Sequence, residues 1–217
     1  MGNKHKGVLF VDFNGVISYN PFWNSLTNKK HKLHSYYPKI ENLLFKSQNK
    51  IEGLVNDWMI GKYTSEEINK IISDKTGIDK DELFKIFCED CKKLDISINI
   101  LKLVKQLKDS WYCILRTDNM DSFHRFTIPA NPILSESFHE IHSSYKIKSL
   151  KRSDGGKKYL DTIMSAGFKI NDCVLIDDGQ KNCELFEDLG GKAFCTKNED
   201  EVLAVLKNLS ATTRNRT

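Results

Sequence analysis

The stretch VLFVDFNGVIS (residues 8–18) opens with a short run of β-branched and aromatic residues, which ends in a carboxylate, Asp12. Such a run is typical of a strand that is buried on both faces of a parallel sheet. An aspartate directly after a buried strand is costly unless a metal ion or a reaction uses it. The stretch therefore predicts a parallel sheet with a polar site at the carboxyl end of its first strand.

Four later segments extend this pattern, namely residues 111–117, 173–178, 192–196 and, more weakly, 138–144. Residues 157–166 and 183–189 have the apolar period of helices and separate the later strands. Because strands and helices alternate, the sequence predicts an α/β fold with a doubly wound parallel sheet.

The gap between the first two strands is far longer than one crossover helix needs. Its period is mostly helical. Thr64 or Ser65 is the expected N-cap of a helix that ends at Gly77, and Asp79 is the expected N-cap of the next. The predicted division is a core domain over residues 1–18 and 97–210, a helical insert over residues 19–96 and a frayed tail over residues 211–217.

Composition argues against several classes of protein. The net charge of +4 is too small to indicate nucleic-acid binding, and no apolar run approaches the roughly 20 residues of a membrane span. The N-terminal residues MGNKHK lack the apolar segment of a signal peptide. With six scattered cysteines, we expect a cytoplasmic protein with reduced thiols.

Polar residues collect where the predicted strands end: Asp12, Thr117 and the pair Asp177–Asp178. Each alone also suits a turn or a helix cap. In an open parallel sheet, however, ligands bind beyond the carboxyl ends of the strands, so these side chains are expected to meet. Carboxylates facing one another suit a hard, oxygen-ligated cation such as Mg²⁺. Asp12 is then a candidate nucleophile for attack on phosphorus.

Taken together, the motifs DFNGVI (12–17), ILRTDN (114–119), a lysine near position 151 and VLIDDGQKN (174–182) resemble the haloacid dehalogenase (HAD) superfamily of phosphotransferases. The resemblance covers the core from end to end. The insert resembles that family's helical cap, and WMIGKYTSEEI (58–68) is similar to phosphatase domains of epoxide-hydrolase type.

The resemblance implies a Mg²⁺-dependent hydrolase that acts through an aspartyl phosphate on Asp12. Asp177 would hold Mg²⁺ together with Asp12 and the backbone carbonyl of Asn14, and Asp178 would support them. Thr117, at the head of its motif, would bind the phosphate of the substrate.

Three further site residues follow from the same resemblance. Asp118 belongs to the Thr117 motif, and Asn182 would brace the lysine or the metal ligands. The lysine that neutralises phosphate charge is ambiguous, because residues 146–158 hold several. Alignment favours Lys151, with Lys148 and Lys157 as alternatives.

Asn14 departs from the family pattern, since the family's phosphatases carry Asp there to protonate the leaving alkoxide and then activate water. An amide cannot exchange a proton at neutral pH, and general acid–base catalysis is typically worth about 10²–10⁴ in rate. Three explanations stay open: an Asp→Asn substitution introduced to trap substrate, a natural variant that is slow or only binds, and a dehalogenase-type hydrolase. The pair Asp177–Asp178 argues against the last, which needs no magnesium site.

The expected substrate is a small phosphate ester such as a nucleotide or sugar phosphate, because basic runs flank the motifs; the alternative function is a silenced HAD-fold protein that binds a phosphorylated ligand. Phe22, Trp23, Tyr36 and Tyr37 either stack on a base or pack the core of the insert, and we favour packing. The pairs Cys88/Cys91, His31/His34 and His139/His142 lack the partners of a metal site and are interpreted as packing or surface residues.

Overall fold

A five-stranded, entirely parallel sheet forms the centre of the computed structural model, which describes residues 5–46 and 51–214. Its strands are β1 (Val8–Val11), β2 (Tyr112–Thr117), β3 (Glu140–Ser143), β4 (Val174–Asp177) and β5 (Lys192–Cys195), in the order β3-β2-β1-β4-β5. Every neighbouring pair runs parallel. The predicted sheet is therefore confirmed, and the weak candidate at 138–144 is the edge strand β3.

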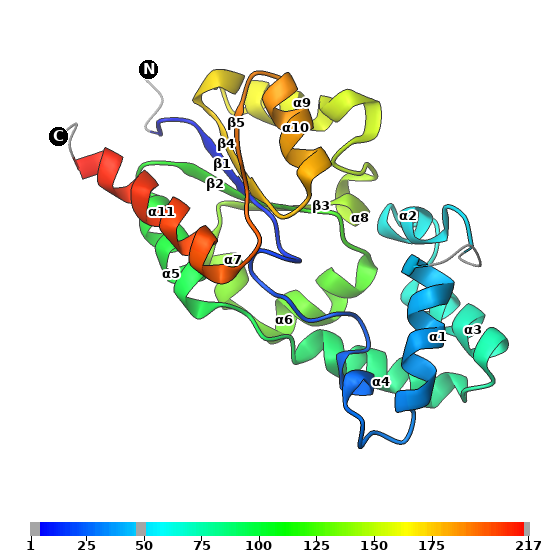
Figure 1. Ribbon diagram of the computed structural model, residues 1–217. Coiled ribbons are helices and arrows are strands. Elements are labelled where there is room, and N and C mark those ends of the chain that lie inside the picture. The colour runs from blue at the N-terminus through cyan, green and yellow to red at the C-terminus, as the bar shows by residue number, and fades with distance from the viewer. Residues whose placement is uncertain (1–4, 47–50, 215–217) are drawn as a thin grey trace.

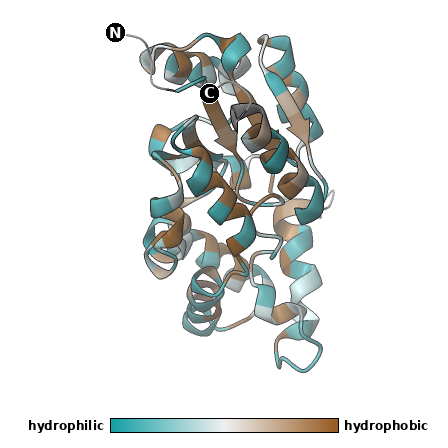
Figure 2. Ribbon diagram, turned by 90° about the vertical axis from the view of Figure 1, so that its left-hand side faces the viewer, coloured by the Kyte–Doolittle hydropathy of each residue, from teal (hydrophilic) through white to brown (hydrophobic). Residues whose placement is uncertain are grey.

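Helices cover both faces of the sheet, as alternation along β1 requires. Leu9 and Val11 pack against α5 (Ile98–Leu107), α7 (Ile133–Ser137) and α11 (Glu199–Arg214). Val8 and Phe10 face the other way, toward α9 (Lys157–Ser165) and α10 (Gln180–Asp188). Figure 1 shows the two helical layers on either side of the strands. In Figure 2 the hydrophobic strand residues lie inside a shell of helices whose outer faces are largely hydrophilic.

The long segment between β1 and β2 folds into helices beside the sheet, next to the end of β1 (Figure 1). They are α1 (Tyr37–Glu41), α2 (Leu54–Met59), α3 (Ser65–Thr76) and α4 (Lys80–Lys92). Thr64, rather than Ser65, is the N-cap of α3, because its hydroxyl accepts from the backbone N–H of Glu67 in a full capping box. Gly77 ends α3 in the left-handed conformation, and Asp79 caps α4, as predicted.

Two boundaries differ from the sequence-based expectation. Residues 39–48 have a polar and an apolar face, which predicts one helix there; the structure divides this segment between α1 and a π-helical turn, Asn42–Lys46, and residues 47–48 lie outside the described residues. The tail that was expected to fray from residue 211 is helical to Arg214, the end of α11. Within residues 5–46 and 51–214, no helix combines the length and apolar character needed to cross a membrane.

The insert has a hydrophobic core of its own. Trp23, Trp58 and Phe87 are fully buried in it, with ring centroids 4.8 Å apart for Trp23–Phe87 and 5.8 Å for Trp58–Phe87. Phe22, Tyr36 and Tyr37 pack against this cluster, as the packing interpretation expected. Met120, from the loop after β2, is buried in the same cluster, so the insert is joined to the sheet by shared apolar surface.

A buried carboxylate, Asp121, ties the insert to the same loop. It accepts hydrogen bonds from the Trp58 indole (3.1 Å), from the Ser65 hydroxyl (2.6 Å) and backbone N–H (3.2 Å), and from Arg125 (2.7 Å). Arg125 also makes a two-pronged pair with Glu66 of α3. Burial raises the pKa of Asp121, but the bonds from Ser65 and Arg125 outweigh burial and hold the pKa below its ordinary value.

Replacing Asp121 tests this connection. Asp121→Asn should lower the free energy of unfolding at pH 7 by about 2–3 kcal/mol, because hydrogen bonds to a buried charge are lost. Since the folded-state pKa is depressed, the contribution is complete above the ordinary pKa of 3.8 and is lost only as the pH falls through the lower folded value. The loss measured by urea unfolding should therefore be equal at pH 5 and pH 7.

The matched control is Glu66→Gln, which breaks an exposed ion pair to the same Arg125. Its cost should stay below about 1 kcal/mol. Equal costs for the two variants would contradict the assignment of Asp121 as the buried connection.

Candidate active site

Because the strands are parallel, the predicted polar residues lie together at the carboxyl ends of the central strands. Asp12 directly follows β1, Thr117 ends β2 and Asp177 ends β4. β1 lies between β2 and β4, and the backbone N–H of Asp12 donates to the carbonyl of Ile176 (2.9 Å). Asp12 and Asp177 are consequently neighbours, although 165 positions separate their numbers in the sequence.

Lys151 lies between these two carboxylates. Its Nζ is 2.7 Å from Asp12 Oδ2 and 2.7 Å from Asp177 Oδ2, and all three side chains are buried. Burial disfavours the charged lysine, but the two carboxylates outweigh burial and raise the pKa of Lys151 above its ordinary value. Burial raises the pKa of Asp12 to about 7, against the opposing effect of Lys151. The ammonium therefore compensates two charges that the fold has removed from water.

The two alternative lysines lie elsewhere. Lys148 is exposed, with its Nζ 4.2 Å from the centre of the Tyr145 ring. Lys157 is exposed at the start of α9. Of the lysines considered, Lys151 is the one that meets Asp12.

Asp118 positions the backbone of Lys151. Both of its carboxylate oxygens accept the Lys151 backbone N–H, at 2.9 and 3.2 Å. Burial raises the pKa of Asp118 above its ordinary value, against the opposing effects of Lys151 and Arg116. In this arrangement Asp118, which the sequence placed among the substrate-binding residues, acts on the loop that carries Lys151.

Three carboxylates converge here. Oxygens of Asp12, Asp177 and Asp178 lie within 4.8 Å of one another, the one such group of potential metal ligands in the described part of the chain. Asp177 is oriented by the Gly179 backbone N–H (2.8 Å) and by the Asn182 amide (2.9 Å), so Asn182 braces the carboxylate rather than the lysine. When all are ionised, three carboxylates and one ammonium leave a charge of −2, and the donors are oxygens. The set therefore suits a divalent, oxygen-seeking cation.

Gly15 is required at this point of the loop. Its φ is +77°, and a Cβ atom on it would overlap the carboxylate of Asp178. The glycine that follows Asn14 thus allows the loop after β1 to approach the acidic pair after β4.

Thr117 carries an unused hydroxyl. The side chain is 1 % exposed, and its Oγ1 has no hydrogen-bond partner among the described residues. A buried hydroxyl without a partner is costly, so its place at the end of β2 is consistent with a ligand that supplies one.

Asn14 is held by a residue that sequence reasoning missed. Asn119 is 3 % exposed and donates from Nδ2 to Asn14 Oδ1 (2.9 Å), and its backbone N–H donates to the Ser144 hydroxyl (2.9 Å). The sequence signal that could have identified Asn119 is its position two residues after Thr117, which ends β2. The Asn14–Asn119 pair consists of two amides, and neither exchanges a proton at neutral pH.

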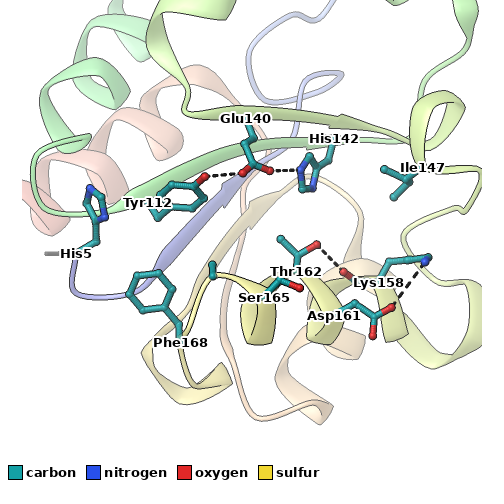
Figure 3. Close-up of a pocket in the computed structure, with 11 residues that line it drawn as sticks. His5, Tyr112, Glu140, His142, Ile147, Lys158, Asp161, Thr162, Ser165 and Phe168 are labelled. Atoms are coloured by element: carbon teal, nitrogen blue, oxygen red, sulfur yellow. Dashed lines mark hydrogen bonds and ion pairs between the residues drawn. The ribbon is translucent and has the colours of Figure 1, made fainter. Parts of the chain in front are cut away.

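A cavity of about 10 Å³ adjoins Asn14 beneath the insert, and a much larger one lies away from the carboxylates. The larger cavity, about 650 Å³, lies between the edge strand β3 and α9 (Figure 3). Tyr112 donates to Glu140 (2.5 Å), and Glu140 also pairs with His142. Asp12, Asp177 and Lys151 line neither cavity, so we place the candidate site at these side chains themselves, and the small cavity adjoins it through Asn14.

The remaining predicted pairs lie outside the carboxylate group. Cys88 and Cys91 are free thiols on α4. His139 stacks on Tyr112 with centroids 4.7 Å apart, and its Nδ1 accepts the Cys113 backbone N–H. Cys91 and Cys88 pack in the core of the insert, and His34 contacts the carbonyl of Leu26, so these pairs agree with the interpretation as packing or surface residues.

The fold is shared with solved structures of HAD-family enzymes. A HAD-family enzyme from Bacteroides thetaiotaomicron, in complex with magnesium and inorganic phosphate, matches with a TM-score of 0.67 and 17 % identity over 89 % of this chain and 96 % of that chain. A predicted HAD-like family hydrolase from Porphyromonas gingivalis matches with 0.70 and 18 % over 94 % and 97 %.

The L-2-haloacid dehalogenase from Xanthobacter autotrophicus, with chloropropionic acid covalently bound, matches with a TM-score of 0.57 and 9 % identity over 86 % of this chain and 75 % of that chain. No family model matches this chain, and no curated protein matches it by sequence. The likeness thus lies in the three-dimensional fold, and the fold predicted from the sequence resemblance is confirmed.

Removing the central cation should destabilise the protein. Lys151→Met should lower the free energy of unfolding by about 3–5 kcal/mol at pH 7, because two buried carboxylates then face each other without compensation. Lys157→Met, an exposed lysine six positions later, should change it by less than about 0.5 kcal/mol. Chemical denaturation of both variants measures the difference, and similar small effects would contradict a buried ion cluster.

Proposed function

We propose that this protein is a Mg²⁺-dependent phosphomonoester hydrolase of HAD type whose acid–base step is impaired. The observation that carries the proposal is the Lys151 ammonium held 2.7 Å from both Asp12 and Asp177, with Asp178 beside them. A HAD-family enzyme of the same fold binds magnesium and inorganic phosphate, which supports a phosphoryl substrate and this cation.

Asp12 is the proposed nucleophile. Its Oδ1 accepts the Phe13 backbone N–H (2.7 Å) and its Oδ2 faces Lys151, so the carboxylate is fixed at the edge of the sheet. Attack by a carboxylate oxygen on phosphorus forms an aspartyl phosphate while the bond from phosphorus to the leaving oxygen breaks. Lys151 offsets the negative charge on the phosphoryl oxygens, and the Thr117 hydroxyl is free to donate to one of them.

Asp12, Asp177 and Asp178 are the side chains that would hold Mg²⁺, with the Asn14 carbonyl proposed as a backbone ligand. The bound ion would neutralise the excess negative charge of the site and polarise the phosphoryl group. Asn182 and Gly179 contribute by fixing the orientation of Asp177.

Asn14 limits the reaction at two points. The departing alkoxide needs a proton, and the water that hydrolyses the aspartyl phosphate must lose one. The Asn14 amide, whose oxygen accepts from Asn119, serves neither purpose. We therefore propose slow turnover and a long-lived aspartyl phosphate. The insert, residues 19–96, is the proposed cap that excludes water from this site.

A second candidate is a protein that binds a phosphorylated ligand without turning it over. It is favoured by the Asn14–Asn119 pair, which leaves the ligand-holding charges intact while removing proton transfer. The acidic pair after β4 argues against a dehalogenase, whose halide leaves without a metal or a proton.

Restoring the carboxylate distinguishes these candidates. Asn14→Asp should raise phosphate release from alkyl phosphates in the presence of Mg²⁺ by about 10²–10⁴-fold, and Asp12→Ala should abolish it. With p-nitrophenyl phosphate, whose leaving group needs little protonation, the parent chain should release a stoichiometric burst of nitrophenol before slow turnover.

Asn28→Asp, the same change at an exposed position, is the control and should leave turnover unchanged. If Asn14→Asp binds phosphate but hydrolyses no ester, the hydrolase proposal fails and the binding function is favoured.

Magnesium should also stabilise the folded chain. At a free concentration of one hundred times Kd, Mg²⁺ should add about 2.7 kcal/mol to the free energy of unfolding, and chelation by EDTA should reverse the gain. Asp178→Asn should weaken this response, whereas Asp188→Asn, an exposed aspartate at the end of α10, should preserve it. A thermal midpoint that does not respond to Mg²⁺ in the parent chain would contradict a cation at these carboxylates.

A further inference from the structure

Trp23 is held in a backbone conformation that bulky residues rarely adopt. Its φ of 52° and ψ of 42° place it in the left-handed region, directly before the short helix η1 (Asn24–Thr27). A large side chain there is strained, and such strain persists where the surrounding structure fixes it and is often found at functional sites.

The surroundings of Trp23 fix its ring but leave its polar atom unused. The side chain is 1 % exposed and packs on Phe87, with Trp58 and Phe22 each at 6.3 Å between ring centroids. Its indole Nε1 is buried and has no hydrogen-bond partner among the described residues. Burial of an N–H group without a partner is costly, and aromatic packing alone does not require the group.

Trp23 lines the same small cavity as Asn14. Asn119 and Asn20 also line it, so Trp23 borders one space with Asn14, which lies two residues after Asp12. At about 10 Å³ this space holds about one water molecule with the insert in its present position. Trp23, which carries an unpartnered donor, therefore lines a space next to Asn14 that admits only a short group.

The remaining lining of the cavity restricts the charge of that group. Phe13, Phe22, Leu94 and Phe123 supply apolar walls, and Asp90 supplies a carboxylate. None of the residues that line the cavity in the described chain is lysine, arginine or histidine. A leaving group with its own negative charge would meet Asp90 without a compensating cation, whereas a hydroxyl or ether oxygen would meet the indole donor.

We propose that Trp23 determines specificity: its indole N–H donates a hydrogen bond to an uncharged acceptor oxygen on the leaving group of a short, hydroxylated phosphomonoester. The inference rests on the proposed function, because the phosphoryl group is assigned to Asp12, Thr117 and Lys151. It narrows the substrate class from nucleotide or sugar phosphates to short polyol-type esters.

Indole NMR signals test the contact without requiring turnover. The chain has three tryptophans, each with one indole ¹H–¹⁵N signal, which Trp→Phe variants assign. Glycerol 3-phosphate with Mg²⁺ should shift the Trp23 signal, whereas propyl phosphate, which lacks the hydroxyls, should bind and shift it much less. The Trp58 indole, bonded to Asp121, and the Trp111 indole, also buried and unpartnered, are internal controls.

Kinetics of Trp23→Phe in the Asn14→Asp background give the second readout. The variant should lose about tenfold in kcat/KM for glycerol 3-phosphate, because one hydrogen bond is removed, and little for propyl phosphate. An equal loss for both esters, or equal shifts of the Trp23 signal by both, would overturn the role of Trp23 and leave the hydrolase proposal standing. If neither ester nor inorganic phosphate binds, the proposed function itself fails.

Discussion

The pairing of one buried ammonium with two buried carboxylates is the constraint on which the rest of the site depends. Asp12 and Asp177 follow adjacent parallel strands, so the sheet itself forces them together. Two such charges are tolerated inside a protein only if a cation reaches them. Lys151 comes from the connection between β3 and β4, and Asp118 fixes its backbone from the end of β2. The ends of β1, β2 and β4 must therefore be aligned before the charges of Asp12 and Asp177 are compensated.

One short loop connects this ion cluster to the insert. Each of the five consecutive residues 117–121 has a different role. Thr117 carries a free hydroxyl, Asp118 holds the backbone of Lys151, and Asn119 donates to Asn14. Met120 packs in the core of the insert, and Asp121 accepts from Trp58 and Ser65. Because the loop is too short for these contacts to vary independently, a displacement of the insert is transmitted to Asn14 and Lys151 over a few backbone bonds. The position of the insert and the geometry of the site are therefore coupled.

The sequence predicted the central strands β1, β2 and β4 well because they are buried on both faces and most of their residues are apolar, whereas the edge strand β3 is mostly polar and gave only a weak signal. Helix caps such as Thr64 and Asp79 were equally accessible, since a cap is a local bond within one turn. The choice among Lys148, Lys151 and Lys157 could not be made from local sequence alone. It depends on which lysine the loop turns toward Asp177 at the end of β4, 26 residues from Lys151. The bracing by Asp118 and the left-handed backbone of Trp23 are likewise products of tertiary packing, which overrides local preference.

What separates a hydrolase from a binding protein in this fold is the handling of one proton. The charges that hold a phosphoryl group are provided by Asp12, Asp177 and Lys151, and none of them depends on the side chain at position 14. Asn14 and an aspartate have nearly the same shape, and either offers an oxygen to Asn119. An amide there consequently preserves the geometry, the nucleophile and the charge balance while it removes the group that titrates. The reaction then depends on how well the leaving group departs without a proton, which makes the chemistry of the substrate, rather than the architecture of the site, decide whether turnover occurs.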